Sequence, residues 1–325
     1  MVEESGNGHR RAPDAWEEVQ FDGQPRPPDG EAVRRAPPSV RSLLRRYGFR
    51  PRKKLGQNFL VDEDILDRTA DVAEVGPAEE VLEIGPGLGT LTLRLAERAG
   101  RVVAVELDAE LARIVEETVA GHDNVTVVHQ DILRFSPAAY FRPRAYKVIG
   151  NLPYYVTSPI LRHFLENECP PSLMVMMLQR EVAERITARA GEMSLLAVSV
   201  QLYAEPKIVR LVDAGAFYPP PKVDSALLRL DLLPKPAVDV NRERFFAVVS
   251  AGFSQPRKQL HNALSQRFWM HPGQATELLR EVGIDPRRRA ETLSLEEWAE
   301  LARAFERAGV VKPRPAEESE PPSSP

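Results

Sequence analysis

The 325-residue chain has a single cysteine, Cys169, so it cannot form an internal disulfide bond. Its cysteine and histidine residues also lack the spacing of zinc ligands, which excludes a disulfide-stapled secreted module and a structural zinc domain. No run reaches the ~18 consecutive apolar residues that a membrane-spanning helix needs. The first residues, 1–5, carry no apolar signal core, so we expect a cytoplasmic protein.

Hydrophobic residues make up 43% of the chain and charged residues 28%, enough to bury a substantial core. The formal net charge of -4 hides a local asymmetry. Residues 32–61 hold nine Lys/Arg and no acid, and residues 235–315 hold 14 Lys/Arg against 10 Asp/Glu. A polyanion partner fits this distribution, and so does ordinary solvated surface charge.

Proline is concentrated at the two ends, where 12 of the 29 prolines fall in residues 1–51 and 312–325. We interpret residues 1–40 and 312–325 as disordered. Between them, short apolar runs alternate with helical patterns, which is typical of a parallel sheet with helices on both faces. The predicted strands are 81–84, 102–105, 125–129, 147–149, 173–178 and, as a late antiparallel addition, 223–230; the predicted helices between them are 90–98, 109–119 and 158–168.

After Pro234 the periodicity becomes purely helical, and helices are predicted at 245–253, 257–268, 275–282 and 295–308. The predicted fold class is therefore α/β. An α/β domain over residues 41–233, with a basic N-terminal lead-in, precedes a small all-α domain over residues 234–311.

The first predicted strand ends in a glycine-rich turn at residues 85–89. Glycines let the backbone approach a ligand, and the following helix offers free N–H groups. Thr90 stands where the dinucleotide pattern G-x-G-x-x-G needs a small residue, and Pro86 removes a donor that a pyrophosphate could use. The turn favours a nucleoside without a diphosphate, with a purely structural tight turn as the alternative.

Acidic residues end the next two strands. Glu106 lies 21 residues after Gly85, where a carboxylate can accept from both hydroxyls of a ribose. Asp131 ends the third strand, where a short acid can accept from an adenine amino group. Either residue alone is more often a helix cap or an ion-pair partner. Three such features at successive strand ends favour a phosphate-free nucleoside and indicate S-adenosylmethionine.

Asn151-Leu152-Pro153-Tyr154 follows the fourth predicted strand directly. The lone pair of an exocyclic base amine is delocalised into the ring, so two acceptors aimed at its hydrogens are needed to point it at a methyl donor. The side-chain oxygen of Asn151 and the carbonyl of Leu152 can do this, with Tyr154 stacking on the base. The segment predicts methylation of a base amine, with a strand-ending Asn-x-Pro turn as the alternative.

In this combination the chain resembles the ribosomal RNA adenine dimethyltransferase family. The resemblance covers residues 53–308 and rests on five segments in order: 53–60, 83–89, 151–154, 177–183 and 217–225. It implies a Rossmann-like S-adenosylmethionine-dependent methyltransferase domain and a helical RNA-facing domain. Tyr155 and Pro256 depart from the family pattern, and residues 1–40 match nothing in it.

The resemblance also implies roles for individual residues. Asn58 and Leu60 would lie over the methionine end of the cofactor, a role that spacing alone does not show. Phe217 would face Tyr154 across the target base. The implied cofactor contacts are Asn58, Leu60, Gly85, Glu106, Asp131 and Asn151, and the implied catalytic residues are Asn151, Leu152, Tyr154 and Phe217.

Residues 252–258 and 283–291 resemble the branch of the family that modifies the small ribosomal subunit. That branch implies transfer of two methyl groups to N6 of each of two adjacent adenosines near the 3′ end of 16S rRNA, linked to small-subunit biogenesis. The implied partners are small-subunit rRNA and the immature subunit, and we expect a monomer. Arg257, Lys258 and residues 287–289 either meet phosphates or are solvated helix ends.

Three alternatives stay open. A large-subunit methyltransferase of the macrolide-resistance type shares the catalytic residues but acts on another RNA. A ribosome-assembly factor would act mainly by binding, with methylation incidental. A methyltransferase for small molecules is the weakest alternative, because it would not need basic flanks.

Overall fold

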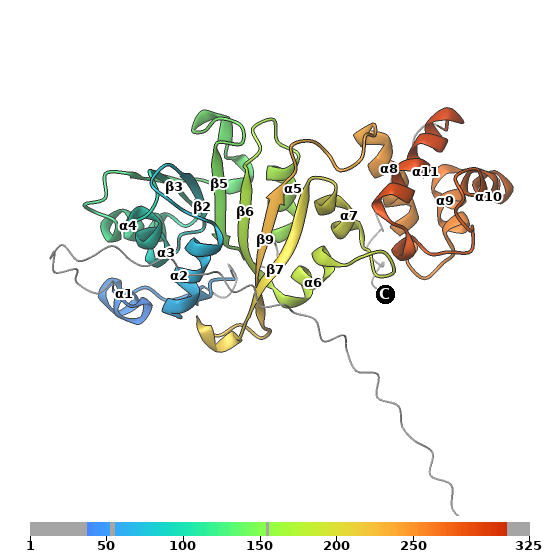
Figure 1. Ribbon diagram of the computed structural model, residues 1–325. Coiled ribbons are helices and arrows are strands. Elements are labelled where there is room, and N and C mark those ends of the chain that lie inside the picture. The colour runs from blue at the N-terminus through green and yellow to red at the C-terminus, as the bar shows by residue number, and fades with distance from the viewer. Residues whose placement is uncertain (1–37, 53–55, 154–155, 311–325) are drawn as a thin grey trace, which may run out of the picture. The chain divides into compact units, whose positions relative to one another are not determined.

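The computed structural model describes residues 38–52, 56–153 and 156–310. A seven-stranded sheet runs through it in the order β4-β3-β2-β5-β6-β9-β7 (Figure 1). The five strands from β4 to β6 are parallel, and β9 pairs antiparallel with both β6 and β7. The strands are β2 (Glu80–Ile84), β3 (Arg101–Glu106), β4 (Val125–His129), β5 (Tyr146–Asn151), β6 (Leu173–Gln179), β7 (Ala204–Val212) and β9 (Ser225–Leu232).

The sheet confirms the predicted α/β class, with its five parallel strands and the late antiparallel strand. Strand β7 was not predicted. Its sequence contains Pro206 and the charged residues Glu205, Lys207 and Arg210, and most of its residues are partly or fully exposed. Such a sequence suits an edge strand, which proline can occupy without losing a bond in the middle of a sheet.

Helices cover both faces of the sheet. Successive strand residues point to opposite faces, so neighbouring residues of one strand pack against different helices. Val81 packs with residues of α2 (Glu63–Val72) and α3 (Thr90–Ala96). Its neighbour Leu82 packs with residues of α5 (Thr157–Leu165), α6 (Arg180–Thr187) and α7 (Leu195–Gln201). A smaller cluster joins α1 (Val40–Tyr47) and α4 (Ala109–Thr118) through Leu43, Leu111 and Ile114.

Two short elements complete the α/β region: β1 (Phe59–Leu60) pairs antiparallel with β8 (Phe217–Tyr218). Helix α1 was not predicted as a helix. It begins after Ser39, whose side chain accepts from the Ser42 N–H, and ends at Gly48 in the left-handed conformation (φ 62°). The predicted disordered segment 1–40 therefore overlaps the start of α1, and its residues 1–37, like 312–325, lie outside the described residues.

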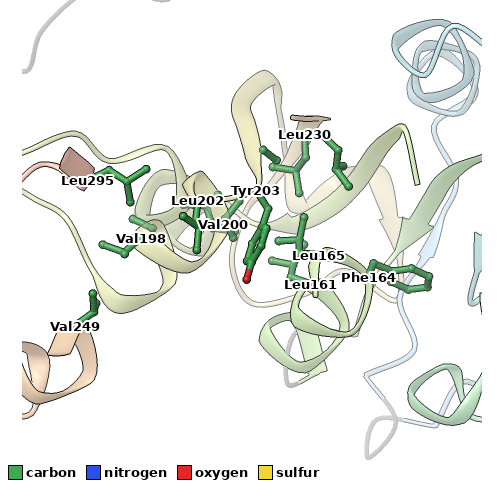
Figure 2. Close-up of a cluster of buried hydrophobic side chains, with 14 of the residues drawn as sticks. Leu161, Phe164, Leu165, Val198, Val200, Leu202, Tyr203, Leu230, Val249 and Leu295 are labelled. Carbon is green, nitrogen blue, oxygen red and sulfur yellow. The ribbon is translucent and has the colours of Figure 1, made fainter. Parts of the chain in front are cut away.

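The four helices predicted after Pro234 are confirmed as α8 (Arg242–Phe253), α9 (Leu260–Phe268), α10 (Pro272–Glu281) and α11 (Leu295–Arg307). Their core is continuous with that of the sheet. Figure 2 shows side chains of α5, α7 and β9 together with Val249 of α8 and Leu295 of α11, all in one buried cluster. The boundary between residues 233 and 234 stays a prediction. No helix in the described ranges is both long and apolar enough to cross a membrane.

Candidate active site

An open pocket lies where β2, β3 and β5 end, at the carboxyl edge of the parallel strands, the position at which open α/β sheets bind their ligands. Residues 56–60 and Leu66 form one wall, and residues 85–88, 90 and 91 form another. The remaining lining residues are Glu83, Glu106, Leu107, Asp108, Leu111, Asn151, Leu152 and Pro153.

The glycine turn is built to let a ligand approach its backbone. Gly85, Gly87 and Gly89 have φ values of 64°, 61° and 82°, a region that residues with a Cβ rarely adopt. A Cβ on Gly87 would lie 3.0 Å from the Phe59 ring, so a side chain there would also crowd the opposite wall. The helix α3 begins directly after this turn at Thr90.

Glu106 ends β3 with its carboxylate directed back to the turn. One oxygen accepts from the Gly87 N–H at 3.1 Å and the other from the Asp108 N–H at 2.9 Å. Burial raises the pKa of Glu106 above its usual range, while these two hydrogen bonds act in the opposite direction. Each oxygen keeps a second lone pair, so the carboxylate can still accept from a bound hydroxyl.

Glu83 is the least expected group in the pocket wall. It is only 1% exposed, and its Oε2 has no hydrogen-bond partner within the described residues. Burial raises the pKa of Glu83 to about 8; the Thr92 hydroxyl acts in the opposite direction, and the nearby carboxylate of Glu106 acts in the same direction as burial. A buried carboxylate without a partner is costly, so this oxygen is a strong candidate to meet a cationic ligand.

Asn151, the last residue of β5, is tied to the opposite wall. Its Nδ2 donates to the backbone carbonyl of Asn58 at 3.0 Å. This bond fixes the orientation of the amide and leaves Oδ1 as the acceptor end. Leu152 follows with its N–H donating to the carbonyl of Met177 at 3.3 Å. The two acceptors predicted to orient an amine are thus held by the β1 segment and by β6.

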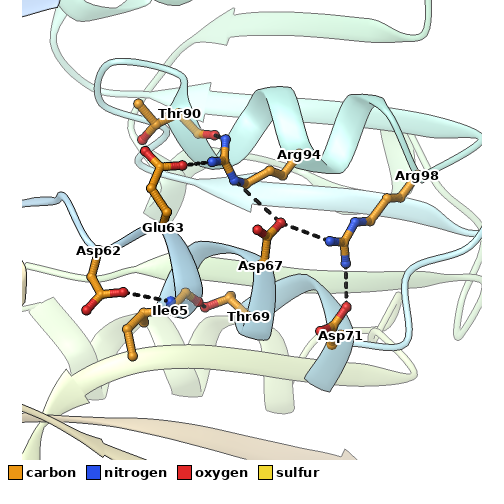
Figure 3. A network of polar contacts seen from close by, with 9 residues as sticks. All are labelled: Asp62, Glu63, Ile65, Asp67, Thr69, Asp71, Thr90, Arg94 and Arg98. Carbon is orange, nitrogen blue, oxygen red and sulfur yellow. Dashed lines mark hydrogen bonds and ion pairs between the residues drawn. The ribbon is translucent and has the colours of Figure 1, made fainter. Parts of the chain in front are cut away.

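A ladder of ion pairs joins α2 to α3, the helices beside the pocket (Figure 3). Arg94 donates to Glu63 and lies 3.6 Å from Asp67. Arg98 donates to Asp67 at 2.9 Å and to Asp71 at 2.6 Å. Because Leu66 of α2 and residues 90–91 of α3 line the pocket, the ladder holds two of its walls together.

The predicted site residues do not all reach this pocket. Asn58, Leu60, Gly85, Glu106, Asn151 and Leu152 line it. Asp131 instead caps a short 3-10 turn by accepting from the Leu133 N–H at 3.0 Å, so its contact with adenine stays a prediction. Phe217 is 3% exposed and packs among apolar side chains, and Tyr154, which it was expected to face, lies outside the described residues.

Sequence reasoning missed Glu83 and Asp108 as lining residues. A signal for Glu83 was present, since an acidic residue stands in the otherwise apolar strand Val-Leu-Glu-Ile. Asp108 is held by residues that are distant in the sequence, so no local pattern predicts these contacts. Its Oδ2 accepts from Arg52 at 2.8 Å and from Gln57 at 3.3 Å.

The charge of the lining selects the kind of ligand. Three carboxylates line the pocket and, of the described lining residues, none is Lys, Arg or His. A diphosphate would be repelled here, whereas a positively charged nucleoside would be attracted. The sulfonium and ammonium groups of S-adenosylmethionine fit these acceptors, and a cation beside Glu83 would favour its ionised form.

Comparison with known proteins agrees with this geometry. The family described as Ribosomal RNA adenine dimethylase matches residues 48–307, most of the chain. The chain belongs to this family. The predicted enzyme class, an rRNA adenine dimethyltransferase, is thereby confirmed, and the predicted cofactor, S-adenosylmethionine, follows from that class.

Among curated relatives, the chain is 44% identical over 269 residues to "Ribosomal RNA small subunit methyltransferase A" of Dehalococcoides mccartyi, covering 82% of this chain and 92% of the relative. It is 45% identical over 289 residues to the protein of the same name from Pelotomaculum thermopropionicum, covering 84% and 98%. The likeness extends over nearly the whole length of both relatives.

Solved structures show the same fold. A dimethyladenosine transferase from Plasmodium falciparum superposes with a TM-score of 0.68 at 24% identity, covering 78% of this chain and 98% of that one. The 23S rRNA methyltransferase ErmE superposes with a TM-score of 0.62 at 32% identity, covering 77% and 100%. These two likenesses confirm the Rossmann-like fold with its helical C-terminal region.

Proposed function

We propose that this protein transfers two methyl groups from S-adenosylmethionine to N6 of each of two adjacent adenosines near the 3′ end of small-subunit rRNA. The observation that carries the proposal is the Asn151 amide, held by Asn58 at the rim of an acid-lined pocket. The 44–45% identity to small subunit methyltransferases A supports the choice of RNA. The substrate would be the immature small subunit, met by a cytoplasmic monomer.

The cofactor would be held by three groups of residues. The backbone of the turn at Gly85 and Gly87 lies beside the carboxylate of Glu106, which accepts from the ribose hydroxyls. Glu83 balances positive charge at the other end. Asn58 and Leu60, on the opposite wall, cover the methionine end. When bound, S-adenosylmethionine supplies a methyl group that is already electrophilic.

The chain itself orients the amine. Oδ1 of Asn151 and the carbonyl of Leu152 would accept the two N6 hydrogens before the first transfer and the one that remains before the second, which turns the nitrogen lone pair away from the adenine ring. Because both acceptors are fixed before the base arrives, no reorganisation is needed during transfer. Tyr154 would stack on one side of the base. Phe217, which is 3% exposed here, would have to leave its apolar cluster to stack on the other side. No nucleophilic side chain is required.

The decisive experiment incubates the purified protein with tritiated S-adenosylmethionine and undermethylated small ribosomal subunits. Large subunits and free nucleosides are the controls. The RNA is digested and its nucleosides are separated. We expect labelled N6,N6-dimethyladenosine from small subunits alone.

The other outcomes distinguish the alternatives. Label in large-subunit RNA alone would contradict the proposal and favour the activity named for ErmE, which is 32% identical to this chain. Absence of label despite bound cofactor would favour an assembly factor that acts by binding.

A further inference from the structure

Helix α1 is fixed against the wall of the cofactor pocket. Its buried side chains Leu43 and Leu44 pack in a cluster with Phe59, Leu88 and Leu111, all three of which line the pocket. Both ends of the helix are capped, by Ser39 and by Gly48. The exposed side of α1 therefore has a defined place beside the site.

That exposed side carries three arginines, Arg41, Arg45 and Arg46, here named the α1 arginine face. Within the described ranges, none of the three forms an ion pair with an acidic residue. Residues 32–61 contain no acid. Within the described ranges, the face is therefore positive and has no acidic partner.

Arg287, Arg288 and Arg289 differ in this respect, whereas Arg257 and Lys258 have no ion pair within the described ranges. Arg287 pairs with Asp285 at 3.0 Å, and Arg289 lies 3.7 Å from Glu291. Arg288 pairs with Glu297. A phosphate would have to compete with a carboxylate for each of these arginines, whereas no carboxylate of the described residues pairs with the α1 arginine face.

Stabilisation of the helix does not account for Arg41. Cations favour the last turn of a helix, where Arg45 and Arg46 lie, but are unfavourable in the first turn. Arg41 is the second residue of α1. Its guanidinium carbon instead lies 5.7 Å from the ring centroid of Tyr218, which is 40% exposed.

Tyr218 connects this face to the site. It follows Phe217 in β8 and pairs with Phe59 of β1, a pocket residue. An exposed aromatic ring beside arginines is a recurrent arrangement for holding single-stranded RNA, because the ring stacks on a base while the guanidinium groups meet phosphates.

We propose that the α1 arginine face and Tyr218 bind the rRNA strand that flanks the target adenosine, with the arginines on phosphates and the Tyr218 ring on a neighbouring base. This inference rests on the proposed function for the identity of the RNA. It assigns the flanking strand to the α1 side of the pocket and not to the paired arginines 287–289.

The test compares the wild type with the triple variant Arg41→Gln/Arg45→Gln/Arg46→Gln. Affinity for the small-subunit RNA is measured at several salt concentrations. We expect affinity to fall about 10-fold or more and the logarithmic salt slope to decrease by about 2, because each lost phosphate contact removes about 0.7. The dissociation constant for S-adenosylmethionine should change less than twofold, which also shows that the pocket has folded.

Tyr218 is tested separately. Tyr218→Ala should raise the KM for RNA about 10-fold with an unchanged KM for S-adenosylmethionine. Tyr218→Phe should keep the wild-type KM for RNA, because stacking needs the ring and not the hydroxyl.

The control for the arginine variant is Arg113→Gln, which changes an exposed arginine of α4 that is paired with Glu117 at 3.1 Å. Its salt slope should equal that of the wild type.

An unchanged slope in the triple variant, or Tyr218→Ala with a wild-type KM, would overturn the inference. Replacement of the three arginines by lysine keeps the charge and should retain most of the slope. Failure of the proposed function would give a different result. A wild-type protein that forms no dimethyladenosine would contradict that function, whereas the salt dependence of RNA binding would still test the α1 arginine face.

Discussion

Single residues at the pocket are oriented by the backbone of other segments. The Asn58 carbonyl holds the Asn151 amide, and the Gly87 and Asp108 N–H groups hold the Glu106 carboxylate. These partners come from parts of the sequence 93, 19 and 2 residues away. The chemistry of the site therefore depends on how β1 and the glycine turn are placed, as well as on which residues carry it.

Asn151→Ala removes the acceptor that would orient the target amine. Turnover on small subunits should fall by about 100-fold or more, the loss typical when a fixed polar group is removed from a reacting centre. Affinity for S-adenosylmethionine, measured by calorimetry, should stay within a few-fold, because most pocket walls are untouched. Activity close to that of the wild type would remove the role assigned to Asn151.

Glu83 should make stability depend on pH. Its pKa is about 8 in the folded protein against 4.5 for an ordinary glutamate, so between these values the folded state holds a proton that the unfolded state has released. Stability contributed by Glu83 is present below about pH 4.5 and is lost as pH rises towards 8. Glu83→Gln imitates the protonated form, so we expect its urea-unfolding free energy to fall less between pH 5.5 and 8.

The matched control is Glu117→Gln, which changes an exposed glutamate of α4. It should show the wild-type pH dependence. Equal slopes for the wild type and Glu83→Gln would mean that Glu83 is ionised throughout this range in the folded protein.

Among the helices and strands, those with a strong hydrophobic pattern could be predicted from the sequence, and those whose structure depends on tertiary context were missed. Strands β2, β3 and β6 are short buried apolar runs and were found. Helix α7 is also a short apolar run, Leu-Leu-Ala-Val-Ser-Val, and periodicity does not distinguish such a segment from a strand. Helices α1, α2 and α6 were missed as well; α1 lies in a segment considered only for its charge, and α6 overlaps a segment considered only for family resemblance.

The residues of the candidate site also divide into those that local sequence patterns predict and those that they do not. Gly85, Glu106 and Asn151 could be placed because parallel strands deliver their ends to one edge. Leu60 lies on β1 and Asn58 directly before it. The position of β1 depends on a two-residue pairing with β8, in which Leu60 pairs with Phe217, 157 residues further along the chain. No local pattern carries that information, so these residues came only from family resemblance.

The ladder between α2 and α3 should be more than a set of surface ion pairs. The Arg94 side chain is only 9% exposed, and Asp67, one of its two partners, also pairs with Arg98. A double-mutant cycle with Arg94→Met and Glu63→Gln should give a coupling of about 1–2 kcal/mol in urea unfolding. The same cycle on the exposed pair Arg113 and Glu117 should give about 0.3–0.5 kcal/mol.

Affinity for S-adenosylmethionine in the Arg94→Met variant should fall a few-fold, because α2 and α3 carry pocket walls. Equal coupling in the two cycles would show that the ladder contributes no more than an exposed pair. An unchanged cofactor affinity would separate the ladder from the pocket.

Across the whole molecule, the helices α8 to α11 share their core with the sheet. Trp298 of α11 is fully buried, and it belongs to the same cluster as Leu82 of β2 and Leu202 beside α7. Backbone bonds cross as well, since the N–H groups of Gly191 and Met193 donate to the carbonyl of Glu291, each at 3.0 Å. A helical region attached in this way should not unfold independently.

Gly252→Ala tests that expectation. A Cβ at Gly252 would come within 2.4 Å of the Trp298 ring, so overpacking should cost about 1–3 kcal/mol, against a gain of about 0.5–1 kcal/mol from replacing a helical glycine.

Thermal unfolding followed by tryptophan fluorescence reports largely on the helical region, which holds two of the three tryptophans. Loss of cofactor binding with temperature reports on the α/β region. We expect both midpoints to fall together by several degrees, while the exposed control Ser250→Ala leaves them in place; a fluorescence midpoint that falls alone would mean that residues 234–311 unfold as a separate domain.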